Sequence, residues 1–341
     1  MNQPSSSPIV TTIGEPGGIG PDIALALWRD RAASETPPFA LLADPDHLAG
    51  RARHLGIEAP IRPVERPLDA ISTFASALPV LPLRSPLSAA PGRLVESDAS
   101  GVVEAIKEAV RLIAAGEAAS MVTLPINKKS LYDAGFDYPG HTEFLAELAR
   151  REWALDAAPL SVMMIAGPDL RTVPVTIHDP LADVPRILSA DLVERTIRIV
   201  ERDMRERFGY AKPRIAVAGL NPHAGEEGTI GSEDEAMIRP VLDGLRGEGL
   251  EIAGPLPADT MFHAEARARY DVAVCMYHDQ ALIPAKTLAF DEGVNVTLGL
   301  PFVRTSPDHG TALDIAGRGI ARPDSTLAAL RMARDMSARL S

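Results

Sequence analysis

Three histidines each follow a short apolar run that predicts a buried β-strand. The runs with their histidines are VPVTIH, ending at His178, IAVAGLNPH, ending at His223, and VAVCMYH, ending at His278. Because the carboxyl ends of parallel strands converge on the crevice where α/β proteins bind ligands, we expect these imidazoles near a site. Three imidazoles with open positions for substrate oxygens suit a divalent transition metal. Spacing alone leaves open whether they are metal ligands or ordinary polar residues at strand ends.

A second set of polar side chains falls within residues 254–310, each just beyond an apolar segment or in a proline-rich loop. Together they supply carboxylates, two cations and an amide, which suit a pocket for a small anionic substrate. The alternative is that each is a solvated loop residue, the usual state of polar side chains between strands and helices. The members of this set are Asp259, Asp279, Lys286, Asn295 and Arg304.

A glycine-rich turn, Gly14–Gly20, lies between a predicted strand at Ile9–Ile13 and a predicted helix at Ile23–Arg29. The exposed N–H groups of such a turn can hold an anion at the start of a helix. The spacing matches neither GxGxxG with its later acidic partner nor a P-loop. A tight turn with no ligand is therefore the alternative interpretation.

Eight sequence blocks, in order, resemble the 4-hydroxythreonine-4-phosphate dehydrogenase family, whose members act in pyridoxal 5′-phosphate synthesis. Together the blocks span most of the chain. They are GEPGGIGPDI at Gly14–Ile23, PINK at Pro125–Lys128, GHTEF at Gly140–Phe144, NPHAGE at Asn221–Glu226, GPLPADT at Gly254–Thr260, MYHDQ at Met276–Gln280, GVNVTLGLPFVRTS at Gly293–Ser306 and DHGTALDIAG at Asp308–Gly317.

Two of these blocks also resemble the isocitrate and isopropylmalate dehydrogenases. The first looks like their GDGIGPE turn, and the last resembles the HGSAPDIAG block of isopropylmalate dehydrogenase. The resemblance implies a two-lobed α/β/α fold of the isopropylmalate dehydrogenase type, with mixed or parallel sheets, rather than a Rossmann fold. It also implies that His309 and Gly310 lie near the adenosine portion of a nicotinamide cofactor, NAD or NADP.

The family resemblance implies roles for individual residues of this chain. His178, His223 and His278 align with the ligands of one divalent metal ion, which would be zinc, magnesium or cobalt. Asp259 and Asp279 are candidates for the substrate ammonium group or for a supporting role, and Lys128 is a candidate for the mouth of the site. The residues that align with the substrate contacts are His141, Thr142, Lys286, Asn295 and Arg304.

One position departs from the family pattern. The first metal ligand is usually followed by an apolar residue, as in HLPL, whereas here Asp179 follows His178. The added carboxylate could orient the imidazole or add negative charge near the metal. It could equally point to solvent.

The resemblance also predicts a reaction and an assembly. NAD(P)+ would oxidise 4-phosphooxy-L-threonine to a β-keto acid, which loses CO2 to give 3-amino-2-oxopropyl phosphate. Members of this family work as homodimers with a shared active site. We therefore predict that His178 and His223 come from one chain and His278 from the other.

Composition narrows the class of protein. The 341 residues are long for one core and favour two lobes. Acidic residues outnumber basic ones, 46 to 34, for a net charge of -12, which argues against a nucleic-acid surface. The single cysteine, Cys275, predicts a small core residue and fits a reducing cytoplasm. No apolar run is long enough for a membrane span, and the amino terminus does not resemble a secretory signal.

Alternating apolar segments predict an α/β architecture with helices on both faces of a largely parallel or mixed sheet. Thr142 and Ser325 are plausible N-caps of two of the helices. From the resemblance, residues 1–125 with 285–341 form a cofactor-side lobe, and residues 126–284 form a metal, substrate and dimerisation lobe, with the active site in the cleft between them. Other predicted elements are strands at Phe39–Ala43, Ser120–Leu124, Leu160–Ile165, Arg171–Ile177 and Arg214–Gly219, and helices at Asp46–Leu55, Asp98–Ala115, Asp191–Phe208, Asp234–Glu248 and Ser325–Leu340.

Three other functions stay open at this point. A sister dehydrogenase would oxidise 4-phospho-threonate or 4-phospho-erythronate, which lack the amino group. A metal-dependent hydrolase would use three histidines and an aspartate to activate water, with no nicotinamide. A non-catalytic phosphate-binding protein would bind its ligand without any metal.

Overall fold

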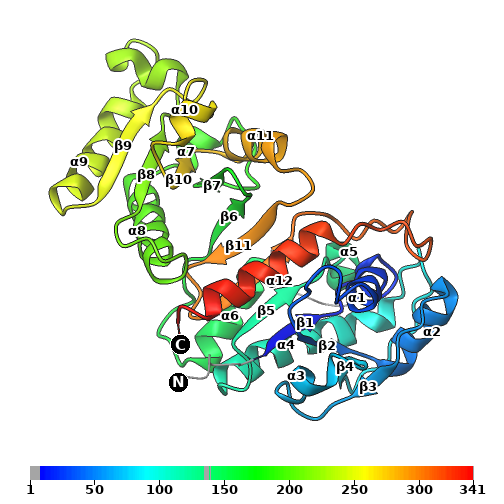
Figure 1. The fold of residues 1–341 in the computed structure, drawn as a ribbon. Helices are drawn as coiled ribbons and strands as arrows, with labels where there is room; N and C mark the ends of the chain where they lie inside the picture. Colours follow the sequence, from blue (N-terminus) through cyan, green and yellow to red (C-terminus); the bar gives the residue numbers. More distant parts are fainter. Residues whose placement is uncertain (1–7, 134–137, 139, 341) are drawn as a thin grey trace. The chain divides into compact units, whose positions relative to one another are not determined.

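The computed structural model describes residues 8–133, 138 and 140–340. The chain divides into two compact units (Figure 1). The first unit comprises Met1–Ser161 and Leu300–Arg339, and the second comprises Val162–Gly299. Each unit is an α/β structure built on its own set of strands, and each is described by itself.

The first unit contains six parallel strands in the order β3-β4-β2-β1-β5-β12. A Rossmann fold would have the order 3-2-1-4-5-6, so the prediction of a different α/β arrangement is confirmed. The strands are β1 (Ile9–Thr12), β2 (Phe39–Ala43), β3 (Ile61–Pro63), β4 (Leu78–Pro82), β5 (Ser120–Thr123) and β12 (Val303–Pro307).

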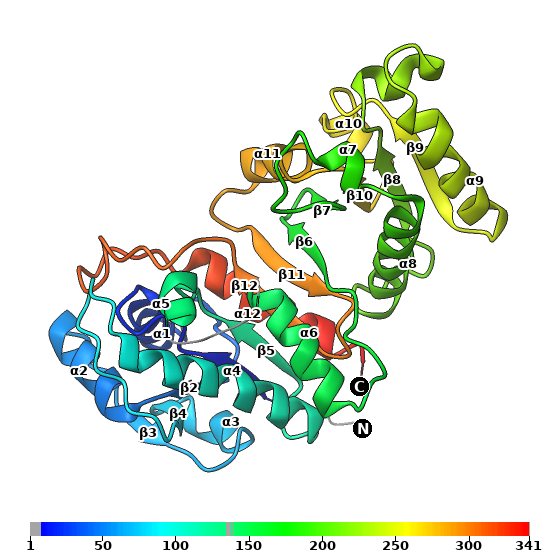
Figure 2. The ribbon, with the colours of Figure 1, turned by 180° about the vertical axis from the view of Figure 1, so that it is seen from behind.

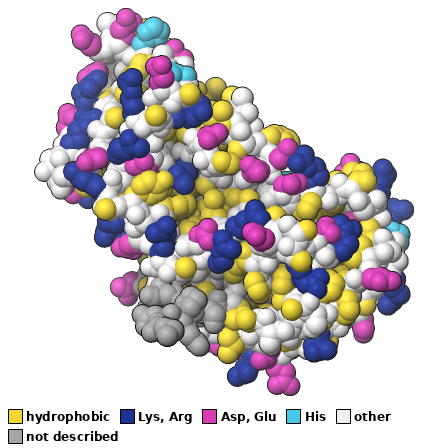
Figure 3. Space-filling model, in the orientation of Figure 1, with side chains coloured by type: hydrophobic (Ala, Val, Ile, Leu, Met, Phe, Trp, Pro, Cys, Tyr) yellow, Lys and Arg dark blue, Asp and Glu magenta, His cyan; other side chains and the backbone are white. Residues whose placement is uncertain are grey.

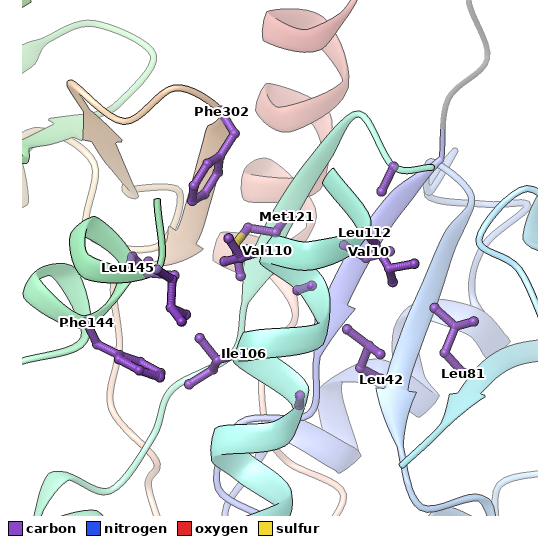
Figure 4. Close-up of a cluster of buried hydrophobic side chains, with 14 of the residues drawn as sticks. Val10, Leu42, Leu81, Ile106, Val110, Leu112, Met121, Phe144, Leu145 and Phe302 are labelled. Carbon is purple, nitrogen blue, oxygen red and sulfur yellow. The ribbon is translucent and has the colours of Figure 1, made fainter. Parts of the chain in front are cut away.

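Helices cover both faces of this sheet. Helix α12 lies in front of the strands in Figure 1, and α4 and α6 lie in front in the reverse view of Figure 2. On the α4 face, Val102, Ile106 and Val110 pack against strand residues such as Val10 and Met121 (Figure 4). The helices of the unit are α1 (Gly20–Arg29), α2 (Pro45–Leu55), α3 (Asp69–Thr73), η1 (Glu96–Asp98), α4 (Ala99–Ala114), α5 (Lys128–Asp133), α6 (His141–Glu152) and α12 (Asp324–Ser337).

The second unit has a mixed sheet in the order β11-β6-β7-β10-β8-β9. Strands β6 and β7 are antiparallel, with Ile165 opposite Thr172. Strands β7, β10, β8 and β9 are parallel. The strands are β6 (Val162–Ala166), β7 (Arg171–Pro174), β8 (Arg214–Ala218), β9 (Glu251–Leu256), β10 (Val272–Cys275) and β11 (Val294–Leu298).

The core of the second unit includes the chain's single cysteine. Cys275 is fully buried beside Ala281 and Ala285 of helix α11, and burial raises the pKa of its thiol. The prediction of a small core residue is therefore confirmed. The helical segments are α7 (Val184–Ile187), α8 (Ala190–Glu206), η2 (Pro222–Gly228), η3 (Asp234–Ile238), α9 (Arg239–Gly247), α10 (Ala264–Arg267) and α11 (His278–Leu288).

Two predicted helix caps are wrong. Gly140, not Thr142, is the N-cap of α6, with the extended backbone that this position requires. Pro323 precedes α12, and the hydroxyl of Ser325 instead accepts a hydrogen bond from the Asp308 N–H at 3.0 Å. The predicted helix Asp234–Glu248 also differs, because its first turn, η3, is a π-helix.

The observed unit bounds differ from the predicted lobes. Residues 126–161 group with the first unit and 285–299 with the second. Helix α6 explains the first difference, because Phe144 and Leu145 pack in the same core as Ile106 of α4. The functional roles assigned to the two lobes stay predictions.

The surface charge and the helices bear on two predictions made from composition, that the protein has no nucleic-acid surface and no membrane span. On the face shown in Figure 3, basic and acidic side chains are interspersed and form no continuous basic face. In the part of the chain that the structure describes, no helix is both long and apolar enough to cross a membrane.

Candidate active site

The three strands that precede the predicted metal ligands lie side by side. β10 pairs in parallel with β7 on one side and with β8 on the other, so that Val274 is opposite both Val173 and Val217. The segments that carry the three histidines therefore leave neighbouring strands at the same edge of the sheet. The parallel pairing agrees with the predicted α/β sheet, and the role of the three histidines stays a prediction.

Two of the three imidazoles lie close together in one chain. The ring centroids of His178 and His278 are 6.0 Å apart. Nδ1 of His278 is 2.7 Å from a carboxylate oxygen of Asp279, which leaves Nε2 as the nitrogen for a metal. A carboxylate on the second ring nitrogen is the usual support of a metal-binding histidine. Asp179, the residue that differs from the family pattern, is exposed.

A complete three-histidine cluster is not assembled within one chain. Among residues 8–133, 138 and 140–340, no group of three histidine, cysteine, aspartate or glutamate side chains lies close enough to hold a metal ion. The donor chemistry of His178 and His278 fits a divalent metal. The third predicted ligand, His223, lies on a turn with an unusual backbone.

His223 begins a run of five residues with left-handed backbone angles. Its φ is 55°, and the four residues after it, through Glu227, have φ between 41° and 78°. Only Gly225 adopts this region at low cost. The other four are not glycine, and each costs roughly 1–2 kcal/mol. Such strain persists only where surrounding contacts hold it, and it is typical of functional sites.

In the first unit, Arg304 lies buried in β12. Its Nε and one terminal nitrogen donate to the hydroxyl oxygen of Thr123, at 3.0 and 2.7 Å. Burial lowers the pKa of Arg304 to about 10, so the guanidinium stays charged near neutral pH. A buried cation anchored in this way is prepared for an anionic partner.

His141 belongs to the same cluster. Its Nε2 is buried and has no hydrogen-bond partner among the described residues. Burial, with the charges of Arg304 and Lys128, lowers the pKa of His141 well below its ordinary value. The ring is therefore neutral near pH 7. Two cations and a neutral imidazole are a combination that suits an anionic ligand.

Gly140, at the start of α6, lies beside the side chains of Glu143 and Lys128. A Cβ there would lie 2.6 Å from a carboxylate oxygen of Glu143 and 3.8 Å from Lys128 Nζ. The structure thus brings together His141, Arg304 and the mouth candidate Lys128. Thr142 follows His141 in α6 and is half-buried.

The two glycine-containing loops of the first unit pack together, although nearly 300 residues separate them. The Ile19 N–H donates to the Thr311 carbonyl at 3.0 Å, and the Gly317 N–H donates to Asp22 at 2.7 Å. A Cβ at position 18 would lie 2.8 Å from the Thr311 carbonyl oxygen, so this close approach requires glycine.

His309 and Gly310 lie in the second of these loops. Nδ1 of His309 is 3.0 Å from the Gly310 carbonyl oxygen, while its Nε2 is buried with no partner among the described residues. Burial lowers the pKa of His309. An orphaned ring nitrogen beside a glycine-rich helix start is compatible with a bound polar ligand.

The remaining predicted substrate residues lie in the second unit. Asp259 and Asp279 line one cavity of about 460 Å³, together with Phe262, Tyr277 and Ile283. Lys286, in α11, and Asn295, in β11, are half-buried. The two carboxylates thus line the same cavity, and their role toward a substrate ammonium stays a prediction.

Comparison with known proteins identifies the family. Residues 35–333 match the family model described as "Pyridoxal phosphate biosynthetic protein PdxA". The chain belongs to the PdxA family. It is 57% identical over 334 residues to a 4-hydroxythreonine-4-phosphate dehydrogenase of Methylorubrum populi, covering 97% of this chain and 95% of the relative. It is 51% identical over 346 residues to one of Bradyrhizobium diazoefficiens, covering 99% of each.

Solved structures agree with this assignment. A Klebsiella pneumoniae 4-hydroxythreonine-4-phosphate dehydrogenase is similar with a TM-score of 0.84 and 34% identity, over 97% of this chain and 100% of the other. A Burkholderia xenovorans terephthalate 1,2-cis-dihydrodiol dehydrogenase is similar with a TM-score of 0.65 and 28% identity, over 96% and 97%. The PdxA-family chain is thus an oxidoreductase with the α/β fold of these dehydrogenases.

Sequence reasoning missed two residues that support the candidate site. Thr123 anchors Arg304, and its only sequence signal is its place at the end of a strand just before the PINK block. Asp234 is fully buried, although the surrounding GSEDEA segment has the composition of a solvated helix start. Neither role can be seen without the long-range contact.

Proposed function

We propose that this PdxA-family chain oxidises the secondary alcohol of 4-phosphooxy-L-threonine with NAD+ or NADP+. The product, 2-amino-3-oxo-4-phosphooxybutanoate, is a β-keto acid that loses CO2 to give 3-amino-2-oxopropyl phosphate. The observation that carries the proposal is the cluster of the buried Arg304 with the half-buried His141 and the exposed Lys128. It suits a substrate whose phosphate and carboxylate are its strongest binding groups.

Each part of the substrate has a chemically matched group in the chain. Arg304 offers a fork of N–H donors to an oxyanion, whereas Lys286 offers a point charge. Neutral His141 can donate a hydrogen bond without adding charge, and Thr142 and Asn295 add short polar groups. Asp259 and Asp279, which line one cavity, suit the substrate ammonium.

Two absent groups would supply the chemistry. His178, His223 and His278 would hold a divalent zinc, magnesium or cobalt ion, which as a Lewis acid lowers the pKa of a bound alcohol. The paired loops 14–23 and 308–317, with His309 and Gly310 on the adenosine side, would hold NAD or NADP, which accepts hydride. The role of the chain's own residues is to bind and orient the substrate.

We further propose a cytoplasmic homodimer with shared active sites. The resemblance to homodimeric dehydrogenases supports it. Twofold symmetry would give two equivalent sites, each drawing on both chains. The single cysteine fits a reducing compartment.

Absorbance at 340 nm tests the proposal. Purified protein is given 4-phosphooxy-L-threonine with NAD+ or NADP+, before and after treatment with a chelator. We expect reduction of the nicotinamide that stops when the metal is removed and returns when it is restored. Faster turnover of 4-phospho-threonate or 4-phospho-erythronate would assign the chain to a sister activity, and turnover without nicotinamide would overturn the dehydrogenase proposal.

A further inference from the structure

Asp234 contacts the segment that leads from β8 to His223. One of its carboxylate oxygens accepts the Leu220 N–H at 2.7 Å, and the other accepts the Asn221 N–H at 3.0 Å. The second oxygen also accepts the Asn221 side-chain N–H at 3.0 Å. Asp234 is fully buried and begins the π-helix η3, where the helix N-terminus favours a carboxylate.

The same carboxylate is packed against the left-handed turn. A Cβ on Gly219 would lie 2.8 Å from an Asp234 carboxylate oxygen and 2.7 Å from Ala224 Cα, so strand end, turn and carboxylate are in contact. A Cβ on Gly225 would lie 3.2 Å from Asp234 Cβ. Asp234 therefore packs against the turn, whose strained backbone requires support from surrounding contacts.

Gln280, in the first turn of helix α11, holds the same segment from the other side. Its side-chain oxygen accepts the Met276 N–H at 2.7 Å, and its side-chain nitrogen donates to the Gly219 carbonyl at 2.8 Å. Met276 lies just before His278, and Gly219 lies just after β8. One buried amide thus links the segments that carry two of the three histidines.

We propose that Asp234 and Gln280 are positioning residues that clamp the left-handed turn and so set the position of His223 relative to His278. Neither residue is a metal ligand in this proposal. They act through backbone groups at 219–221, which fix where the turn begins. The predicted effect on metal binding rests on the proposed metal site. The clamp itself does not, because its contacts are present in the metal-free chain.

Isosteric substitutions test the clamp. Asp234→Asn places an amide N–H₂ group against a backbone N–H donor whichever way the amide is turned, that of Leu220 in one orientation and that of Asn221 in the other. Gln280→Glu keeps the acceptor for Met276 N–H but directs a carboxylate oxygen at the Gly219 carbonyl. Gln280→Glu changes a contact of the segment before the turn without altering Asp234. If one of the two variants fails to fold, the other still tests the clamp.

Asp271→Asn is the matched control. Asp271 accepts the Arg214 N–H at 2.8 Å and pairs with the Arg214 side chain, at the opposite end of β8. The Asp271→Asn substitution therefore weakens a similar carboxylate-to-backbone contact on the same strand and leaves the turn unchanged.

The first readout uses metal-free protein. The His223 Cε1–H resonance, assigned by its loss in His223→Ala, is compared by NMR across the variants. We expect it to move in Asp234→Asn while those of His178 and His278 stay, and we expect exchange of the Leu220 and Asn221 amides to accelerate. Asp271→Asn should change neither. An unmoved His223 resonance in both clamp variants would overturn the proposal.

The second readout is cobalt affinity, measured by titrating Co²⁺ into the metal-free protein. Loss of supporting contacts around metal ligands typically weakens metal binding by about 10–100-fold, which is the drop expected for each clamp variant. Adding Glu227→Gly, which relieves one left-handed residue, should recover part of the loss in Asp234→Asn. Clamp variants that bind Co²⁺ as tightly as Asp271→Asn would contradict the proposal. A wild-type chain that binds no Co²⁺ would instead remove the proposed metal site and leave the clamp to be decided by NMR.

Discussion

The two units present their polar residues in opposite ways. In the first unit, Arg304 lies within a strand, is buried and is held by Thr123. In the second unit, His178 and His223 are exposed and lie beyond strand ends, and the rings of His178 and His278 lie 6.0 Å apart. By our proposal the first arrangement binds an anion within one chain. The second, by the same proposal, is a ligand set that a metal and a partner chain complete.

The metal ligands should give the largest effects. We expect His178→Ala, His223→Ala and His278→Ala each to abolish measurable turnover, because removing one imidazole opens the metal's coordination shell. The fold should survive, since His178 and His223 are exposed. Metal content of the purified variants and the rate at 340 nm are the measurements. Full metal content with a near-normal rate would remove that residue from the site.

The anion cluster should be sensitive in a graded manner. Arg304→Ala should weaken transition-state binding by about 2–4 kcal/mol, or roughly 30- to 700-fold in kcat/KM, because a buried charged hydrogen bond is lost. Lys286→Ala should lose less, because a point charge fixes geometry less firmly. Each variant is compared on phosphorylated and dephosphorylated substrate. An equal loss on both would show that the residue does not bind the phosphate.

The contrast between the units also shows what sequence can predict. Strand Phe39–Ala43 was predicted with its observed bounds because a fully buried strand is a continuous apolar run. The neighbouring ends of β7, β10 and β8 followed from the α/β pattern. The roles of Thr123 and Asp234 did not, because each depends on a contact with a distant segment or on an unusual backbone. The Ser325 cap failed for a similar reason, since its hydroxyl serves the distant residue Asp308.

Mixed dimers test whether the second site is shared. We predict that inactive His178→Ala and inactive His278→Ala, unfolded and refolded together, regain roughly a quarter of wild-type activity. Random pairing makes about half the dimers mixed, and one of the two sites in each mixed dimer is wholly wild type if His278 comes from the partner. Activity after refolding is the measurement.

A second mixture supplies the control. His178→Ala with His223→Ala should regain nothing, because both ligands are predicted to come from one chain. No recovery in the first mixture would show instead that the 6.0 Å pair of His178 and His278 within one chain belongs to one site.

The smallest predicted effect concerns His141 and stability. Burial, with Arg304 and Lys128 nearby, lowers the pKa of His141 in the folded chain, whereas the unfolded chain keeps an ordinary value near 6.5. Below pH 6.5 only the unfolded chain binds a proton at His141, so the free energy of unfolding falls by up to about 1.4 kcal/mol for each unit that the pH drops. Above pH 6.5 both states leave His141 neutral, and His141 contributes no pH dependence to stability.

We expect His141→Gln to show a shallower loss of stability than wild type between pH 7 and pH 5, measured by urea unfolding. His54→Gln, at an exposed position, is the control and should keep the wild-type slope. Equal slopes for His141→Gln and wild type would show that His141 takes up a proton in the folded chain, and the neutral imidazole assigned to the anion site would be wrong.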